Sequence, residues 1–204
     1  ARPIRWILAR YGTRPIRCRV AGHTRSDRTW VGLPKHPQAI PVTSARRYFT
    51  VLAGRGIIVD HHARRRRIEH MVARLARRHG GLPAPEMVSH GLLDEVTFLV
   101  EQPACLIGAF DAKFLDLPRE VLLASMAKYQ RLFALDATAG NQRRKGTALV
   151  PKFIAVLDGP PRASARVRGM FEHILNARLA DSLLFRNEDR RRLPLERMAT
   201  GLSG

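Results

Sequence analysis

Cysteine is scarce in this sequence, since Cys18 and Cys105 are the only two among 204 residues. They lie far apart and outside any metal-ligand spacing, which excludes a disulfide framework and predicts two buried or inert thiols in a reducing compartment. The chain also lacks an apolar run of about 18 residues and a secretory hydrophobic region. We therefore expect neither membrane insertion nor export, and we expect a cytoplasmic protein.

The sequence also lacks the common motifs of a self-contained active site. The stretch LAGRGIIVD has neither the spacing nor the Lys–Ser/Thr pair of a phosphate-binding P-loop, and no CxxC pair, HExxH helix or Ser-His-Asp order occurs. The triplet DHH at Asp60–His62 is similar to the signature of metal-dependent phosphoesterases, which gather several more Asp and His ligands around a metal pair. The N-terminal region adds only Asp27 before Glu69. We therefore predict no catalytic residue, no metal ligand and no cofactor bound by this chain, and we rank a phosphoesterase last.

Acidic residues are few, because 17 Asp and Glu stand against 36 Lys and Arg, for a formal net charge of +19. Residues 1–80 hold 19 basic and 3 acidic side chains, residues 81–135 hold 4 and 7, and residues 136–204 hold 13 and 7. An uncompensated excess of one sign destabilises the compact state by self-repulsion. Arginine, which dominates the excess, presents a planar fork that suits phosphate oxygens. The charge therefore favours an anionic partner, nucleic acid before an acidic protein, at the N-terminal part and the C-terminal end.

Apolar patterning predicts both strands and helices. Strands are expected at 3–11 and 15–21 (a hairpin around Gly12–Thr13), 56–60, 104–110, 131–137 and 148–158. Helices are expected at 45–53, 61–81, 86–100, 118–130 and 165–185, with Ser44 capping the first and a proline-rich loop at 32–41. This mixed order predicts an α+β fold, a mixed sheet with packed helices in one compact body domain over residues 1–204. A subdivision near residues 80–85 is the alternative.

The segment 61–81 is the clearest helix and the strongest functional signal. Its apolar residues fall on one helical stripe, Gly80–Gly81 ends it, and arginines cover the remaining surface. A solvated helix surface is the simpler interpretation, but only Glu69 interleaves, so pairing within the helix cannot neutralise the arginines. Phosphate contact is therefore favoured here, in the basic loop between the last two expected strands, and near the C-terminus. The candidate nucleic-acid-binding residues are Arg64, Arg65, Arg66, Arg67, Arg74, Arg77, Arg78, Arg143, Arg144, Lys145, Arg190, Arg191 and Arg192.

Several stretches, taken in their order, resemble the β subunit of the bacterial two-subunit glycyl-tRNA synthetase. They are ARPIRWILARYG, AGHTRSDRTW, IIVDHHARRRRIEHMV, GLLDEVTFLVEQPACLIGAFDAKFLDLPREVLLASM, PKFIAVLDG and NARLADSLLFRNEDRRR. The fourth matches best, both in its LLDEV core and in the FLDLPREVL that follows. Each stretch alone is a weak signal, but the ordered set runs from Arg2 to about Glu196 and resembles a central body portion of that much longer subunit.

The resemblance implies a tRNA-binding body domain, with glycine tRNA as the RNA and a separate catalytic α subunit as the protein partner. ATP and Mg²⁺ are implied only for that catalytic subunit. The resemblance also places NARLADSLLF in a structural helix, in which we expect Arg178 and Asp181 to form an i,i+3 ion pair. Two alternatives stay open: a protein-interaction or assembly domain that docks its arginines on an acidic partner, and a divergent paralogue that binds RNA without synthetase activity.

Overall fold

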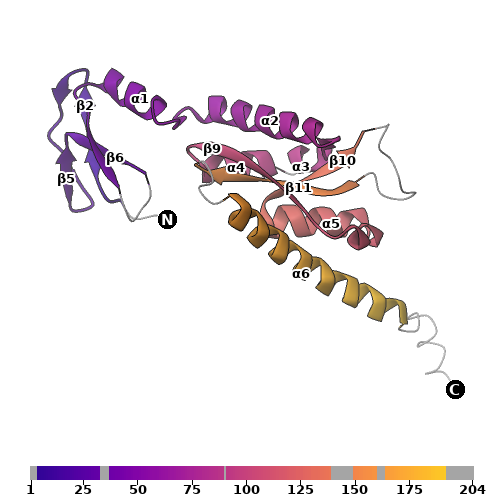
Figure 1. Ribbon diagram of the computed structural model, residues 1–204. Helices are drawn as coiled ribbons and strands as arrows, with labels where there is room; N and C mark the ends of the chain where they lie inside the picture. Colours follow the sequence, from indigo (N-terminus) through magenta and orange to yellow (C-terminus); the bar gives the residue numbers. More distant parts are fainter. Residues whose placement is uncertain (1–3, 33–36, 90, 139–148, 160–163, 192–204) are drawn as a thin grey trace. The chain divides into compact units, whose positions relative to one another are not determined.

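The computed structural model describes residues 4–32, 37–89, 91–138, 149–159 and 164–191 (Figure 1). The chain divides into two compact units, residues 1–61 and residues 62–204. Strands arranged in several sheets are combined with packed helices, so the predicted α+β fold is confirmed. No helix in these described ranges is long and apolar enough to cross a membrane.

The described part of the first unit, residues 4–32 and 37–61, consists of short strands and one helix. Its strands are β1 (Ile7–Leu8), β2 (Arg10–Tyr11), β3 (Arg14–Pro15), β4 (Arg19–Val20), β5 (His23–Ser26), β6 (Arg28–Val31) and β7 (Gln38–Pro41). They form a three-stranded sheet in the order β1-β5-β4 and the two pairs β2-β3 and β6-β7. Helix α1 (Ala45–Ala53) follows, and Ser44 caps it as predicted, because its Oγ accepts a hydrogen bond from the Arg47 N–H at 3.1 Å.

The predicted hairpin is only partly present in this unit. Its turn is confirmed, with Gly12 at φ +58° between β2 and β3. Its long arms are wrong, because residues 7–8 and 19–20 both pair with β5 instead of with each other. The loop expected at 32–41 ends in strand β7, and the strand expected at 56–60 does not form. Instead, the Ile57 N–H donates to the Leu52 carbonyl at 3.0 Å, which continues the turn at the end of α1.

The second unit is organised around an antiparallel sheet in the strand order β8-β10-β11-β9. The strands are β8 (Gly81–Pro83), β9 (Pro103–Ala109), β10 (Leu132–Ala137) and β11 (Leu149–Asp158). All but β8 were predicted within two residues of their observed ends. Gly108 on β9 lies opposite Phe153 on β11, and a Cβ atom at position 108 would lie 2.3 Å from Phe153 Cζ. The missing side chain therefore leaves the space that the buried Phe153 ring fills.

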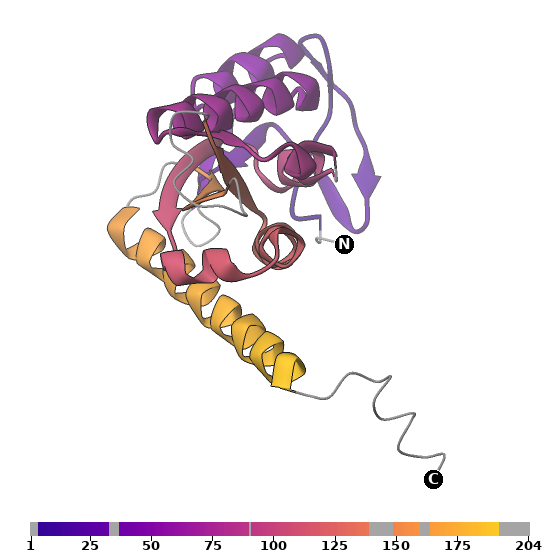
Figure 2. The ribbon, with the colours of Figure 1, turned by 90° about the vertical axis from the view of Figure 1, so that its right-hand side faces the viewer.

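Helices cover both faces of this sheet. They are α2 (His61–Arg78), α3 (Pro85–Ser89), α4 (Leu92–Leu99), the 3₁₀ segment η1 (Ala112–Asp116), α5 (Arg119–Ala124), the π-helical segment η2 (Ser125–Gln130) and α6 (Ser164–Arg191). Figures 1 and 2 show α2 on one face and α5 and α6 on the other. The core between these layers includes Ile68 and Val72 of α2, Phe133 and Phe153 of the sheet, and Leu179 of α6.

Two helix predictions for this unit are corrected by the structure. The single helix expected at 86–100 is divided into α3 and α4, because Gly91 has φ +78° and cannot continue a right-handed helix. The helix expected at 118–130 turns into a π-helical segment at Ser125, which Arg131 ends with φ +53°.

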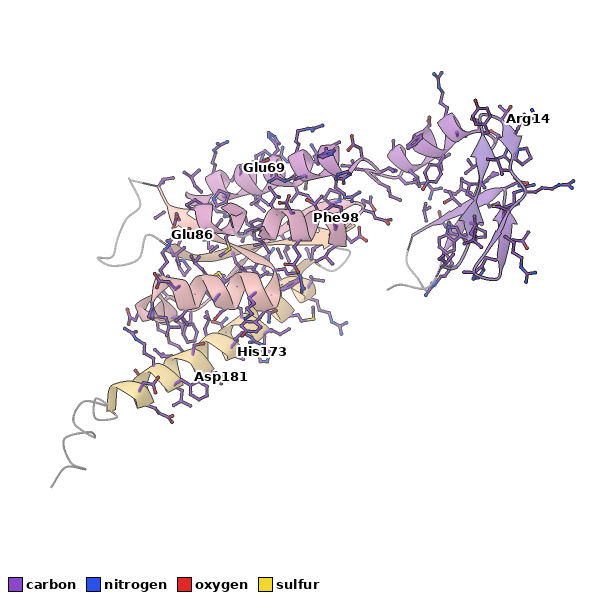
Figure 3. The ribbon with its side chains drawn as sticks, turned by 180° about the vertical axis from the view of Figure 1, so that it is seen from behind. Arg14, Glu69, Glu86, Phe98, His173 and Asp181 are labelled. Carbon is purple, nitrogen blue, oxygen red and sulfur yellow. The ribbon has the colours of Figure 1, made fainter. Side chains whose placement is uncertain are left out.

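The expected ion pair between Arg178 and Asp181 is also wrong. Both residues lie on α6, where Figure 3 labels Asp181, but no ion pair among the described residues joins them. The guanidinium carbon of Arg178 lies instead 4.2 Å from the centroid of the Tyr129 ring. An i,i+3 ion pair stabilises a helix by only about 0.3 kcal/mol, so stacking on an aromatic ring can replace it. The pair is also in the weaker order, because the basic residue precedes the acidic one.

Candidate nucleic-acid interface

The candidate interface is built on α2, which buries one side and leaves arginines on the other. Ile68, Val72 and Ala76 are buried against the rest of the second unit. Five arginines, which we name the arginine stripe, are exposed: Arg66, Arg67, Arg74, Arg77 and Arg78. With 3.6 residues per turn and a rise of 1.5 Å, they occupy an arc of about 120° and a length of about 18 Å. Figure 3 shows nitrogen-tipped side chains along this outer side of α2.

Two of the predicted arginines on α2 are held by α4 instead. Arg64 exposes only 8% of its surface, and its Nε donates to the Thr97 carbonyl at 2.8 Å. The Nε of Arg65 donates to Asp94 Oδ1 at 2.5 Å, and its Nη1 lies 3.6 Å from Glu69 Oε2. The hydrogen bond to Asp94 raises the pKa of the Arg65 guanidinium above its ordinary value. The hydrogen bonds of Arg64 to Thr97 and of Arg65 to Asp94 hold α2 against α4.

The arginine stripe carries uncompensated charge. Among the described residues, none of its five members has a hydrogen-bond acceptor or an ion-pair partner. Glu69 is the only acidic residue on α2, and it lies on the side of Arg65. Arg77 and Arg78 also suit the negative end of the helix dipole, since both lie in its last turn. That effect does not apply to the other three, which lie farther from the helix end.

The stripe is also close enough to β9 to act on its cysteine. Burial raises the pKa of the Cys105 thiol to about 11, and the positive charges of Arg67 and Arg74 partly oppose that rise. The thiol is therefore uncharged at neutral pH and unsuited to nucleophilic attack.

The other predicted binding residues stay a prediction. Arg143, Arg144, Lys145 and Arg192 lie outside the described residues. Arg190 and Arg191 are the last two residues of α6, but their side chains are also outside what the structure describes.

Sequence reasoning missed a charged cluster around Arg119. Its Nε and Nη2 donate to the two carboxylate oxygens of Glu86, both at 2.9 Å, and its Nη1 and Nη2 donate to those of Asp136 at 2.6 and 3.0 Å. These carboxylates raise the pKa of Arg119 further above its ordinary value. The cluster borders a pocket of about 540 Å³ that also includes Glu95 and Glu120. Lys128 also lines this pocket, so acidic and basic side chains are mixed there, and Arg119 is already bound to two carboxylates instead of being available to a phosphate.

The DHH triplet lies at the start of α2. Asp60 immediately precedes α2, which begins at His61. Within the described part of the chain, no three His, Cys, Asp or Glu side chains converge in an arrangement that could hold a metal ion.

A comparison with known protein families identifies the family of this chain. The family model described as "Glycyl-tRNA synthetase beta subunit" matches residues 1–204. The chain belongs to this family. The resemblance noted in the sequence is therefore confirmed.

Relatives named as β subunits of glycine–tRNA ligase match nearly the whole chain. The protein of Moorella thermoacetica is 38% identical over 192 residues, which cover 93% of this chain and 26% of the relative. Those of Dictyoglomus turgidum and Syntrophomonas wolfei are 37% and 36% identical, over 100% and 99% of this chain and 28% of each relative. The chain thus spans about a quarter of the length of these glycyl-tRNA synthetase β subunits, in their N-terminal part rather than at their centre.

Proposed function

We propose that this chain is a tRNA-binding part of a glycyl-tRNA synthetase β subunit, which holds glycine tRNA while a separate catalytic subunit forms glycyl-tRNA. ATP and Mg²⁺ act in that catalytic subunit under this proposal. The observation that carries the proposal is the arginine stripe, five exposed arginines along one side of α2 with no acidic partner among the described residues.

The physical reason is the release of counterions. RNA phosphates hold a condensed layer of cations, and each arginine that neutralises a phosphate releases part of that layer. The gain is greatest for arginines that are not already paired within the protein, because no internal ion pair has to be broken. The stripe meets this condition, whereas Arg65, which is bound to Asp94, does not.

The test replaces Arg66, Arg67 and Arg74 by glutamine together in the full chain. Arg65 is left unchanged, because its loss would also loosen α2 from α4. We expect the affinity for glycine tRNA to fall roughly 100-fold at about 0.1 M salt, and the slope of log affinity against log salt to become shallower by roughly 2. Filter binding or fluorescence anisotropy across a salt series measures both.

The matched control replaces Lys128, Arg166 and Arg168 by glutamine, since none of these three has an ion-pair partner among the described residues. This variant has the same net charge as the first but leaves the stripe intact, because these exposed residues lie on η2 and α6. We expect its affinity to stay within about threefold of the original protein, a change of under 1 kcal/mol. Equal losses in both variants would show that the total charge matters and the stripe does not, which would contradict the proposal.

A further inference from the structure

The first unit contains an aromatic pocket that the arginine stripe does not involve. It has a volume of about 430 Å³, within the range of about 300–1,000 Å³ that is common for small-ligand sites. Its aromatic lining consists of Trp6, Tyr48 and Phe49, and Leu8 and Arg10 also border it. The residues come from β1, β2, α1 and the segment before β1, so several separate parts of the unit form one concavity.

Two of these rings present their surfaces to solvent. Phe49 is 58% exposed and Trp6 is 37% exposed. Trp6 is held in place by Trp30, with ring centroids 4.9 Å apart and planes tilted by 39°. The ring centroids of Tyr48 and Phe49 lie 5.5 Å apart, with their planes inclined at 76°. The pocket therefore offers pre-positioned aromatic surface.

Arg10 brings a fixed positive charge to the pocket. Its Nη1 donates to the carbonyls of Thr13 and Thr43 at 2.9 and 3.1 Å, and its Nη2 donates to Asp27 Oδ1 at 2.8 Å. Its Nε is buried and has no acceptor among the described residues. The guanidinium is therefore fixed by its Nη atoms, and it holds its positive charge at the border of the pocket.

The surroundings of the pocket are cationic. Asp27 is the only acidic residue before Asp60, and both Arg10 and Arg25 already bind it. Exposed arginines without a carboxylate partner among the described residues include Arg14, which Figure 3 labels, as well as Arg46 and Arg47 beside the pocket residues of α1. An aromatic concavity within a cationic surface is the arrangement that single-stranded nucleic acids favour, because bases stack on rings while phosphates meet the charges.

We propose that this pocket binds one unpaired nucleotide of a single-stranded RNA segment. The base stacks on Phe49 and Trp6, beside the positive charge of Arg10. The inference extends the proposed function, because it also takes RNA as the partner. It adds an unpaired base recognised by the first unit to the phosphates contacted by the stripe of the second.

The test compares two labelled RNA strands on the full chain. One is a short single-stranded oligoadenylate, and the other has the same length and phosphates but no bases. The substitution is Phe49→Ala, since Phe49 is exposed and its loss leaves the Trp6–Trp30 contact in place. Its matched control is Tyr11→Ala, which removes an aromatic ring that is 80% exposed in the same unit but outside the pocket lining. Circular dichroism verifies that both variants are folded.

We expect the original protein and Tyr11→Ala to bind oligoadenylate about 5- to 100-fold more tightly than the abasic strand, as stacking on one ring provides. Phe49→Ala should lose most of this preference while its affinity for the abasic strand stays unchanged. Quenching of tryptophan fluorescence by oligoadenylate but not by the abasic strand would support the same conclusion.

The proposal is overturned if the original protein binds both strands equally, or if Phe49→Ala keeps the full preference. Neither result touches the arginine stripe, whose glutamine variant is tested with whole tRNA. Loss of the base preference together with an intact stripe effect, or the reverse, therefore tells which of the two proposals has failed. If both variants bind as the original protein does, both proposals are wrong.

Discussion

At the scale of single residues, Arg119 is an arginine whose guanidinium is bound by carboxylates within the protein. Its guanidinium binds Glu86 of α3 and Asp136 of β10, each through both carboxylate oxygens. The three side chains are half-buried, so their interactions are less screened than those on the open surface. Because α3, α5 and β10 meet at this one residue, its role is to hold three elements together.

We expect Arg119→Gln to lower the free energy of unfolding by about 2 kcal/mol, because Glu86 and Asp136, both half-buried, lose their bidentate contacts with the guanidinium. Arg119→Lys should recover little of this loss, since an ammonium cannot bind two carboxylates bidentately. Urea denaturation measures both. The control is Arg131→Gln, which breaks a single exposed pair with Glu95 and should cost at most about 0.5 kcal/mol. If the Arg119 and Arg131 variants lost equal stability, the contacts of Arg119 with Glu86 and Asp136 would be no stronger than an ordinary surface ion pair.

Prediction from sequence at this scale depended on which interactions are local. Helical periodicity placed the arginines of α2 outside its apolar stripe, and five of them are exposed as it implied. Periodicity could not tell that Arg64 and Arg65 bind Thr97 and Asp94, because these partners lie about 30 residues farther along the chain. The partners of Arg119 were out of reach for the same reason.

At the scale of elements, the break between α3 and α4 decides how the second unit packs. Asp94 and Thr97, which hold α2, lie on α4, so the direction of that short helix matters. Gly91 sets its start with φ +78°, a left-handed conformation that costs other residues energy because of their Cβ atom.

We expect Gly91→Ala to lower the free energy of unfolding by about 1 kcal/mol. A Cβ atom there would meet no atom within 4 Å, so the whole cost comes from the backbone. Gly169→Ala is the matched control, because Gly169 lies inside α6 and is equally unobstructed. In a regular helix the same change should raise stability by about 0.8 kcal/mol. Chemical denaturation of the two variants should therefore give opposite signs, and equal signs would contradict this account of the break.

Long elements were predictable and short ones were not. Helices α2 and α6 and strands β9 and β11 are long enough for their apolar pattern to repeat, and all four were predicted, although α6 continues to Arg191, six residues past its expected end. The strands of the first unit are two to four residues long, which is too short for a period to appear. Their pairing is decided by contacts distant in sequence, such as that of Ile7 with Arg25. The aromatic pocket depends on this pairing, so the sequence alone did not reveal it.

At the scale of the whole molecule, the net charge of +19 predicts that the affinity for RNA depends on the salt concentration. Only basic side chains that are not already paired can replace the cations condensed on RNA. The five arginines of the stripe therefore set the minimum dependence of the affinity on salt. If all five contact phosphates, log affinity should fall with log salt with a slope of roughly −4. Contacts by the first unit would make the slope steeper.

The last prediction concerns the choice of RNA. Phosphate contacts fix position but carry no sequence information, so the stripe alone should bind glycine tRNA and an unrelated tRNA with the same slope. A base in the pocket of the first unit adds a term that depends on the unpaired nucleotides and varies little with salt. Measured side by side across a salt series, the two tRNAs should therefore give parallel lines, separated vertically by whatever base recognition contributes. Salt-independent binding would contradict phosphate contact, and it would favour an apolar protein interface as the purpose of this surface.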